Sequence, residues 1–263
     1  MLEAALFGAI AQSALVIGAL LVWKFPQLKK PVIVGALMAF GAGAVISAVS
    51  IDLVAVAYDE AGAGPTALGI GIGCLIYFGI IRLLERLGKE EQPGEAIQGE
   101  VEGTGPHGDL AVHGASKKEA RNLTVGMVID GVPESIAIGL TLHTAAAGVS
   151  AALVGSIFIA AIPEAIGIAA ALLAGGIAFG AVLLRFSFIV VLGAVFAAVG
   201  YSLLYGASDS TQSIIQSVAA GALLVVVINE MIPIAVRAVK GWAGIIGAAG
   251  FVFSAILTWV SGG

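Results

Sequence analysis

The sequence predicts an all-α, polytopic membrane protein with eight transmembrane helices. Apolar residues make up 59% of its 263 residues, and charged residues make up only 11%. A soluble domain of this size carries about 25% charged residues to cover its surface, so most of the outward surface is expected to face lipid. The apolar runs also lack the alternation of membrane β-strands, and helices can satisfy their backbone amides internally.

Each spanning helix needs about 20 mostly apolar residues, because the hydrocarbon core is about 30 Å thick and each residue rises about 1.5 Å. The first apolar run lacks a basic leading region, so we expect a retained helix rather than a signal peptide. We expect one transmembrane domain over residues 1–263. The eight predicted segments are 2–22, 31–57, 64–81, 122–142, 146–174, 178–206, 212–236 and 242–260.

All twelve Lys and Arg residues fall on the same side of this eight-span arrangement. Cytoplasmic loops are enriched in Lys and Arg, so both termini are expected to be extracytoplasmic, in a multi-pass protein of the cell (plasma or inner) membrane. The stretch 88–118 is rich in Gly and Glu and has few apolar side chains. It is predicted to be a flexible cytoplasmic loop between the third and fourth segments.

Five acidic residues lie inside the apolar segments, and no Lys or Arg lies at comparable depth to neutralise them. A charged group at mid-membrane costs roughly 2.5–3.5 kcal/mol on insertion scales. These carboxyl groups are therefore expected either to be protonated and hydrogen-bonded between helices or to be visited by a cation. The five residues are Asp52, Asp130, Glu134, Glu164 and Glu230.

Two of the five lie in related Pro-Glu motifs, Pro133-Glu134 in the fourth segment and Pro163-Glu164 in the fifth. Asp130 and Glu134 have the i, i+4 spacing that places both on one helix face. Carboxylates that share a face supply oxygen ligands for a hard or borderline cation. The repeated pair predicts a metal site near the middle of the membrane.

A proline inside a helix removes one backbone hydrogen bond and frees the carbonyl four residues earlier. Those carbonyls belong to Ile129 and Ile159, which we consider as backbone ligands. In the seventh segment, Pro233 would free the carbonyl of Asn229, next to Glu230. The three prolines thus predict kinked helices with oxygen atoms near the acidic side chains.

The second and seventh segments resemble each other. Ala-Gly-Ala at 42–44, followed by Asp52, aligns with Ala-Gly-Ala at 220–222, followed by Asn229-Glu230. The two segments would cross the membrane in opposite directions, which indicates an inverted repeat of helices 1–3 and 6–8 around a central pair, helices 4 and 5. Carriers that work by alternating access are commonly built in this way. Asp52 would then lie near the outer mouth and Glu230 near the cytoplasmic one.

Two histidines in the predicted loop, His107 and His113, flank Asp109. They are weak candidates for a metal-collecting loop, because two histidines six residues apart on a flexible segment make a poor site. A solvated linker is the simpler interpretation.

These segments and motifs together resemble the ZIP (Zrt-, Irt-like protein) family of divalent metal transporters, over nearly the whole chain. The family's helix 4 motif, His-Asn-x-Pro-Glu-Gly, is matched by Asp-Gly-Val-Pro-Glu-Ser at 130–135. Its helix 5 motif, His or Gln followed by an acid, x, Pro and Glu or His, is matched by Ala-Ala-Ile-Pro-Glu at 160–164. Its helix 7 motif, with acids before Ile-Pro, is matched by Asn-Glu-Met-Ile-Pro at 229–233.

The resemblance implies a transport site of Glu134, Glu164 and Glu230, with Asp130 in place of the helix 4 histidine. It also implies alternating access, by rocking of helices 1, 4, 5 and 6 against helices 2, 3, 7 and 8. We therefore expect entry of the metal past Asp52, coordination at the two Pro-Glu motifs, and exit past Asn229 and Glu230 into the cytoplasm.

The chain would be a divergent bacterial-type member, because it lacks the family's intramembrane histidines. Gly131 stands where the family has Asn, and Ala160 and Ala161 replace polar residues of helix 5. One metal site is therefore simpler than two. An all-oxygen ligand set favours Mn²⁺, Fe²⁺ or Mg²⁺ over Zn²⁺, although Zn²⁺ also accepts carboxylates.

The expected substrate is a divalent cation such as zinc, iron or manganese, with cadmium as a surrogate, and no permanent cofactor is expected. The lipid bilayer is the expected partner, a homodimer is one option, and the net charge of −5 argues against nucleic acid. A sensor or scaffold of the same fold and a carrier of organic cations are alternatives. An enzyme is not expected, since no nucleophile motif accompanies the carboxylates.

Overall fold

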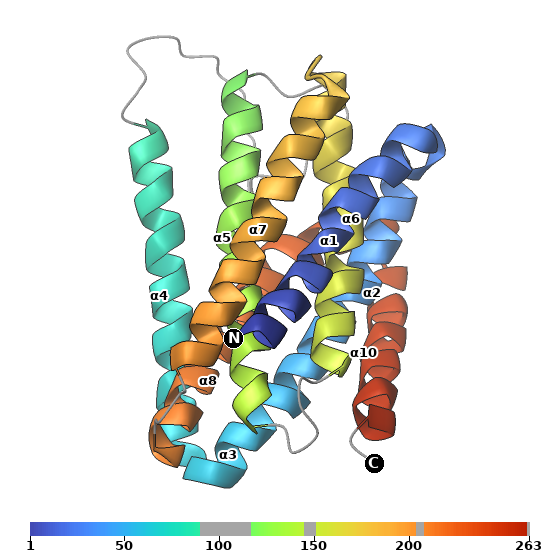
Figure 1. Cartoon of the computed structure of the whole chain (residues 1–263). Coiled ribbons are helices and arrows are strands. Elements are labelled where there is room, and N and C mark those ends of the chain that lie inside the picture. The colour runs from blue at the N-terminus through green and yellow to red at the C-terminus, as the bar shows by residue number, and fades with distance from the viewer. Residues whose placement is uncertain (90–116, 145–150, 204–207, 262–263) are drawn as a thin grey trace.

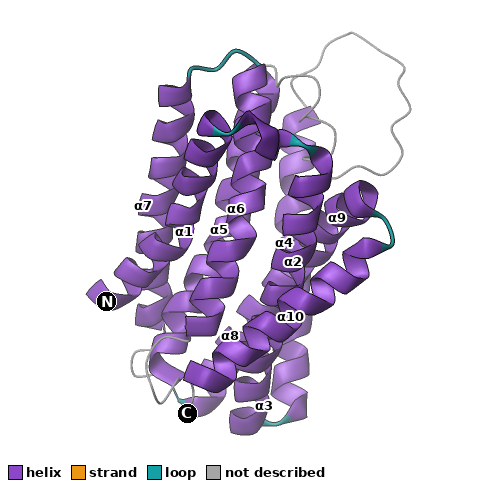
Figure 2. Cartoon of the chain, turned by 90° about the vertical axis from the view of Figure 1, so that its right-hand side faces the viewer, coloured by secondary structure: helices purple, strands orange, loops and turns teal. Residues whose placement is uncertain are grey.

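The computed structural model describes residues 1–89, 117–144, 151–203 and 208–261. Every regular element within these ranges is helical, and the helices form one elongated bundle (Figure 2). The all-α prediction is therefore confirmed for the described part of the chain. Most of the predicted loop 88–118, including His107 and His113, lies outside the described residues.

The helices follow the predicted segments in order. Two π-helical segments, η2 (Val49–Ala55) and η3 (Val227–Met231), join α2 to α3 and α8 to α9, so that each joined pair occupies one predicted segment. A short 3-10 helix, η1 (Pro26–Lys29), precedes α2. The α-helices are α1 (Leu2–Lys24), α2 (Pro31–Ala48), α3 (Val56–Ala61), α4 (Ala63–Lys89), α5 (Lys117–Thr144), α6 (Ala151–Ala174), α7 (Phe179–Leu203), α8 (Asp209–Val226), α9 (Ile232–Val239) and α10 (Trp242–Ser261).

Two helices extend well beyond the predicted apolar segments. Helix α4 continues to Lys89 instead of ending at 81, and α5 begins at Lys117 instead of 122. The added residues are mostly charged or polar, which keeps them out of hydrocarbon but does not stop them from being helical. Helix α5 also remains helical through Pro133.

Seven helical stretches of the described residues are long and apolar enough to cross a membrane. Helix α5 contributes a shorter apolar stretch, Gly131–Leu142, among its described residues. Large apolar side chains such as Leu75, Leu184 and Trp259 are about 70% exposed, as expected where a helix faces lipid rather than water. The chain is thus a multi-pass membrane protein.

The helices of the bundle pack in close pairs. Helix α1 packs against α6 and α7, and α5 packs against α7. Helix α2 packs against α10 and α6, while α4 packs against α8. Figure 1 shows α4 and α10 on opposite sides of the bundle. Alanine is the most frequent residue in the buried core, so the helix axes can approach closely.

Two glycines allow the backbones of α4 and α8 to touch. A methyl group on Gly73 would collide with the carbonyl oxygen of Val218, and one on Gly221 would collide with that of Ile70. Helices α2 and α10 meet in the same way, at Gly43 and Gly250. These positions are occupied by glycine because a side chain there would collide with the neighbouring helix.

Replacing Gly73 with alanine is expected to destabilise the protein by about 1–3 kcal/mol, because an added methyl group overpacks the α4–α8 contact. Thermal unfolding of the purified protein in detergent measures this change. Gly71→Ala is the matched control, since nothing lies within 4 Å of a methyl group at that position. The control should be neutral or stabilising by up to about 1 kcal/mol, and equal destabilisation by both variants would contradict the packing account.

Candidate functional site

Glu134 lies in α5 and is 9% exposed. Its Oε2 accepts a hydrogen bond of 3.2 Å from Nε2 of Gln12, which belongs to α1. Gln12 is itself 2% exposed. Two polar side chains from distant parts of the sequence thus meet inside an apolar bundle, as the high cost of burying an unpaired polar group requires.

Two glycines from other helices provide the space for Gln12. A methyl group on Gly131 of α5 would lie 3.3 Å from Nε2 of Gln12. A methyl group on Gly193 of α7 would lie 2.5 Å from its Cγ and 3.2 Å from Oγ of Ser135. The amide therefore occupies a slot between α5 and α7. Sequence analysis missed this residue, although an isolated amide in an otherwise apolar segment was a signal.

Helix α1 contacts the second Pro-Glu motif as well as the first. A methyl group on Gly18 would lie 2.6 Å from Cβ of Ala165 and 2.9 Å from the carbonyl oxygen of Ile162. These two residues flank Pro163-Glu164 in α6, and Glu164 itself is half-buried. Residues 12–18 of α1 therefore pack against both motifs, and α1 is a structural element shared by Glu134 and Glu164.

The two π-helical segments contain the remaining predicted site residues. Asp52 lies in η2, where it is half-buried and its Oδ2 is enclosed by protein atoms. Asn229 lies in η3 and is exposed. π-Helical turns are rare and occur frequently at functional sites. Pro233 just after η3 could have signalled an irregularity there, whereas residues 49–55 contain no comparable signal.

Three predicted ligands can be placed only by their backbone. Ile129 and Asp130 lie in α5 and Glu230 lies in η3, but their side chains are outside the described residues. Ile159 lies in α6 and is half-buried.

Among the described side chains, no group of three or more His, Cys, Asp or Glu residues could hold a metal ion. Asp52, Glu134 and Glu164 therefore do not form such a site by themselves. Among the predicted ligands, a third carboxylate would have to come from Asp130 or Glu230, whose side chains lie outside the described residues. The predicted combination of Asp130, Glu134 and Glu164 satisfies this condition.

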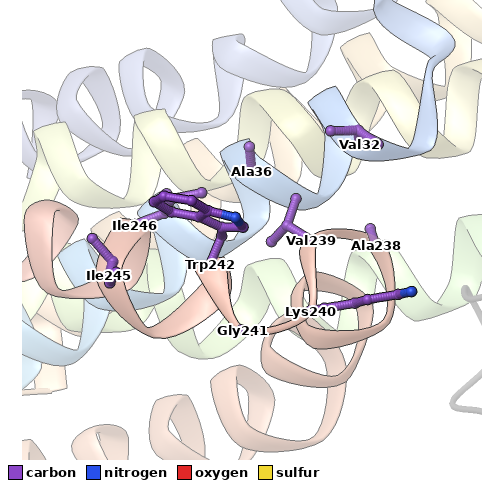
Figure 3. A pocket seen from close by; sticks show the side chains of 9 residues that line it. All are labelled: Val32, Ala36, Ala238, Val239, Lys240, Gly241, Trp242, Ile245 and Ile246. Atoms are coloured by element: carbon purple, nitrogen blue, oxygen red, sulfur yellow. The ribbon is translucent and has the colours of Figure 1, made fainter.

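A groove on the outside of the bundle is separate from these carboxylates. It lies between the start of α2 and the turn from α9 to α10, and its volume is about 640 Å³. Figure 3 shows Val32 and Ala36 of α2 opposite Trp242 and Ile246 of α10, with Lys240 at the turn. Its lining contains no acidic residue, so it is not a candidate metal site.

Comparisons of the chain with models of known protein families and with curated protein sequences find no match.

The hydrogen bond between Gln12 and Glu134 predicts energetic coupling between the two residues. In a double-mutant cycle of Gln12→Leu, Glu134→Leu and the double variant, the coupling energy should be about 0.5–3 kcal/mol. Thermal unfolding of the four purified proteins measures it. Strictly additive effects would contradict the contact.

Proposed function

We propose that this protein carries divalent metal cations across the membrane through a site that includes Glu134. The supporting observation is that Glu134 is buried in an apolar bundle, where it accepts a hydrogen bond from Gln12, a neutral amide. The segments 122–184 and 186–236 contain no Lys or Arg. A cation that visits the site can supply the positive charge that an ionised carboxylate needs at this depth.

The ligand set of the proposed site is built from oxygen atoms. Glu134 and Asp130 come from α5, and Glu164 comes from α6. Gln12 donates to Oε2 of Glu134, which orients the carboxylate. Amide and carboxylate groups that orient a ligand commonly affect metal affinity by about 10–100-fold. Oxygen ligands favour Mn²⁺, Fe²⁺ or Mg²⁺ over Zn²⁺.

The architecture proposed for the carrier is an inverted repeat of α1–α4 and α7–α10 around α5 and α6. Two pairs of contacts support it. In each pair, the two residues of one contact are separated in the sequence from the corresponding residues of the other contact by nearly the same number of positions. In addition, η2 and η3 begin at the same distance after Ala-Gly-Ala at 42–44 and 220–222. In the first pair, Gly73 lies against Val218 and Gly250 lies against Phe40. In the second pair, Gly221 lies against Ile70 and Gly43 lies against Gly247.

Such a repeat suits alternating access, in which one half of the bundle moves against the other around a fixed site. The clustering of the basic residues supports an orientation with the start of α2 and the α9–α10 turn on the cytoplasmic side and both termini outside. The metal would enter past Asp52, bind between α5 and α6, and leave past Asn229 and Glu230. This path, and the resemblance of the motifs to the ZIP family, support transport toward the cytoplasm of the cell.

Uptake of Mn²⁺ into proteoliposomes tests the proposal. Glu134→Gln and Glu164→Gln should each lower the initial rate at least about tenfold, since loss of one charged ligand costs more than about 1.4 kcal/mol. Glu3→Gln is the control, because Glu3 is exposed at the start of α1 and its replacement should leave uptake unchanged.

Normal uptake by both site variants would overturn the assignment of these carboxylates. If Mn²⁺ raised the melting temperature of the wild-type protein without any uptake, the result would support a metal sensor of this fold and overturn the carrier.

The rate of uptake should also fall as the pH on the metal-donating side falls. A carboxylate must be deprotonated to bind a metal ion, so protons and metal compete for the same oxygen atoms. Initial rates between about pH 8 and about pH 5 at fixed Mn²⁺ concentration measure this dependence. Faster uptake at the acidic end would contradict a site made of carboxylates.

A further inference from the structure

The groove between the start of α2 and the α9–α10 turn combines an apolar wall with a basic end. Its volume of about 640 Å³ falls within the range of ordinary ligand sites, about 300–1,000 Å³. Among the described residues that line it, Lys240 is the only charged one, and the others are apolar residues and a glycine. A groove of this composition suits a ligand that has a long apolar part and a negatively charged part.

The apolar wall of the groove follows two helices into the membrane. Val32 and Ala36 are four residues apart, so they lie on one face of α2, and Trp242 and Ile246 are related in the same way on α10. Figure 3 shows the two pairs opposite each other. Val32 is 62% exposed and Ile245, beside Ile246, is 64% exposed. A hydrocarbon chain that lies along these helices can therefore reach the wall.

The basic end of the groove is the turn that joins α9 to α10. Lys240 directly follows the last residue of α9, and α10 begins at Trp242. Both side chains are exposed. Tryptophan is enriched where membrane and water meet, and lysine near a helix end extends its ammonium group to the same level. This end of the groove is therefore at the level of the lipid headgroups.

The backbone of Lys240 adopts a conformation that favours glycine. Its φ of 50° is the only positive φ of a residue other than glycine within the described part of the chain. Such a conformation is costly for a residue with a side chain, and residues held in this way often occur at sites that bind a ligand. A lysine at this position is thus retained at some cost in stability.

The charged residues on both sides of the groove are all positive. Residues 4–51, which include α2, and residues 231–263, which include α9 and α10, contain no Asp or Glu. Basic residues near a membrane surface attract anionic lipids, whereas a zwitterionic headgroup offers no net charge to match. The basic residues of these two stretches are Lys24, Lys29, Lys30, Arg237 and Lys240.

We propose that this groove binds one anionic phospholipid, with an acyl chain between α2 and α10 and the phosphate group at Lys240. The ammonium group of Lys240 carries three donor hydrogens for the phosphate oxygens, and such charge-assisted hydrogen bonds are stronger than neutral ones. The proposal does not depend on metal transport, because the groove is separate from the carboxylates.

Quenching of tryptophan fluorescence tests where the lipid binds. One protein keeps Trp242 alone (Trp23→Phe, Trp259→Phe), and the control keeps Trp259 alone (Trp23→Phe, Trp242→Phe). Each is placed in phosphatidylcholine bilayers that contain a small fraction of brominated phosphatidylglycerol or brominated phosphatidylcholine. Trp242 should be quenched about two- to fivefold more by the anionic lipid. Trp259, which is 70% exposed near the other end of α10, should be quenched equally by both lipids.

Variants of Lys240 test the contribution of its charge. In native mass spectrometry of protein from micelles with equal amounts of the two lipids, the wild type should retain phosphatidylglycerol about fivefold over phosphatidylcholine. Lys240→Gln should lose most of this preference, and Lys240→Arg should keep it. Lys24→Gln is the matched control, because Lys24 is also exposed but lies over the ring of Phe25, 5.7 Å from its centroid, and does not line the groove.

Two results would overturn the lipid site. One is equal quenching of Trp242 by the two brominated lipids, together with a preference for phosphatidylglycerol that Lys240→Gln leaves unchanged. The other is a dimer that Trp242→Ala converts into a monomer, since a second copy of the chain would then cover the groove. Neither measurement involves a metal ion, so a failure of Mn²⁺ uptake would leave the lipid site standing.

Discussion

The burial of Glu134 in an apolar bundle is the constraint on which the rest of the structure depends. Lipid offers no hydrogen bonds, so a carboxyl group at this depth must find its partners inside the protein. Gln12 provides one of them, and Gly131 and Gly193 leave room for it. One hydrogen bond therefore ties α1 to α5 and requires α7 to pass close by.

Close packing of small residues determines where polar groups can be placed. Helices that touch at Gly43, Gly73, Gly221 and Gly250 leave little space between their backbones. A polar side chain in such a bundle either has a partner nearby or marks a place that water or an ion reaches. Glu134 belongs to the first kind through Gln12.

The sequence predicted the helices well because a spanning helix needs a long apolar run, which composition reveals directly. Helix ends such as Lys89 and Lys117 were missed, since charged residues can continue a helix beyond the hydrocarbon. The π-helical turn at Asp52 was not predictable either, because no proline lies in residues 49–55.

The candidate site was predictable in its carboxylates but not in their surroundings. Glu134 and Glu164 could be recognised as acidic residues inside apolar segments. The role of Gln12 became visible only in the structure, where α1 approaches α5, a contact across most of the first half of the chain. The metal ligands Asp130 and Glu230 stay predictions, because their side chains lie outside the described residues.

The most direct test of the account is to locate the ion itself. Crystals of the protein soaked in Mn²⁺ would be measured for anomalous scattering, and metal–oxygen distances near 2.0–2.6 Å identify a ligand. The account predicts a peak beside the carboxylate of Glu134, within reach of α6. A map with no peak next to Glu134 at saturating Mn²⁺ would contradict it.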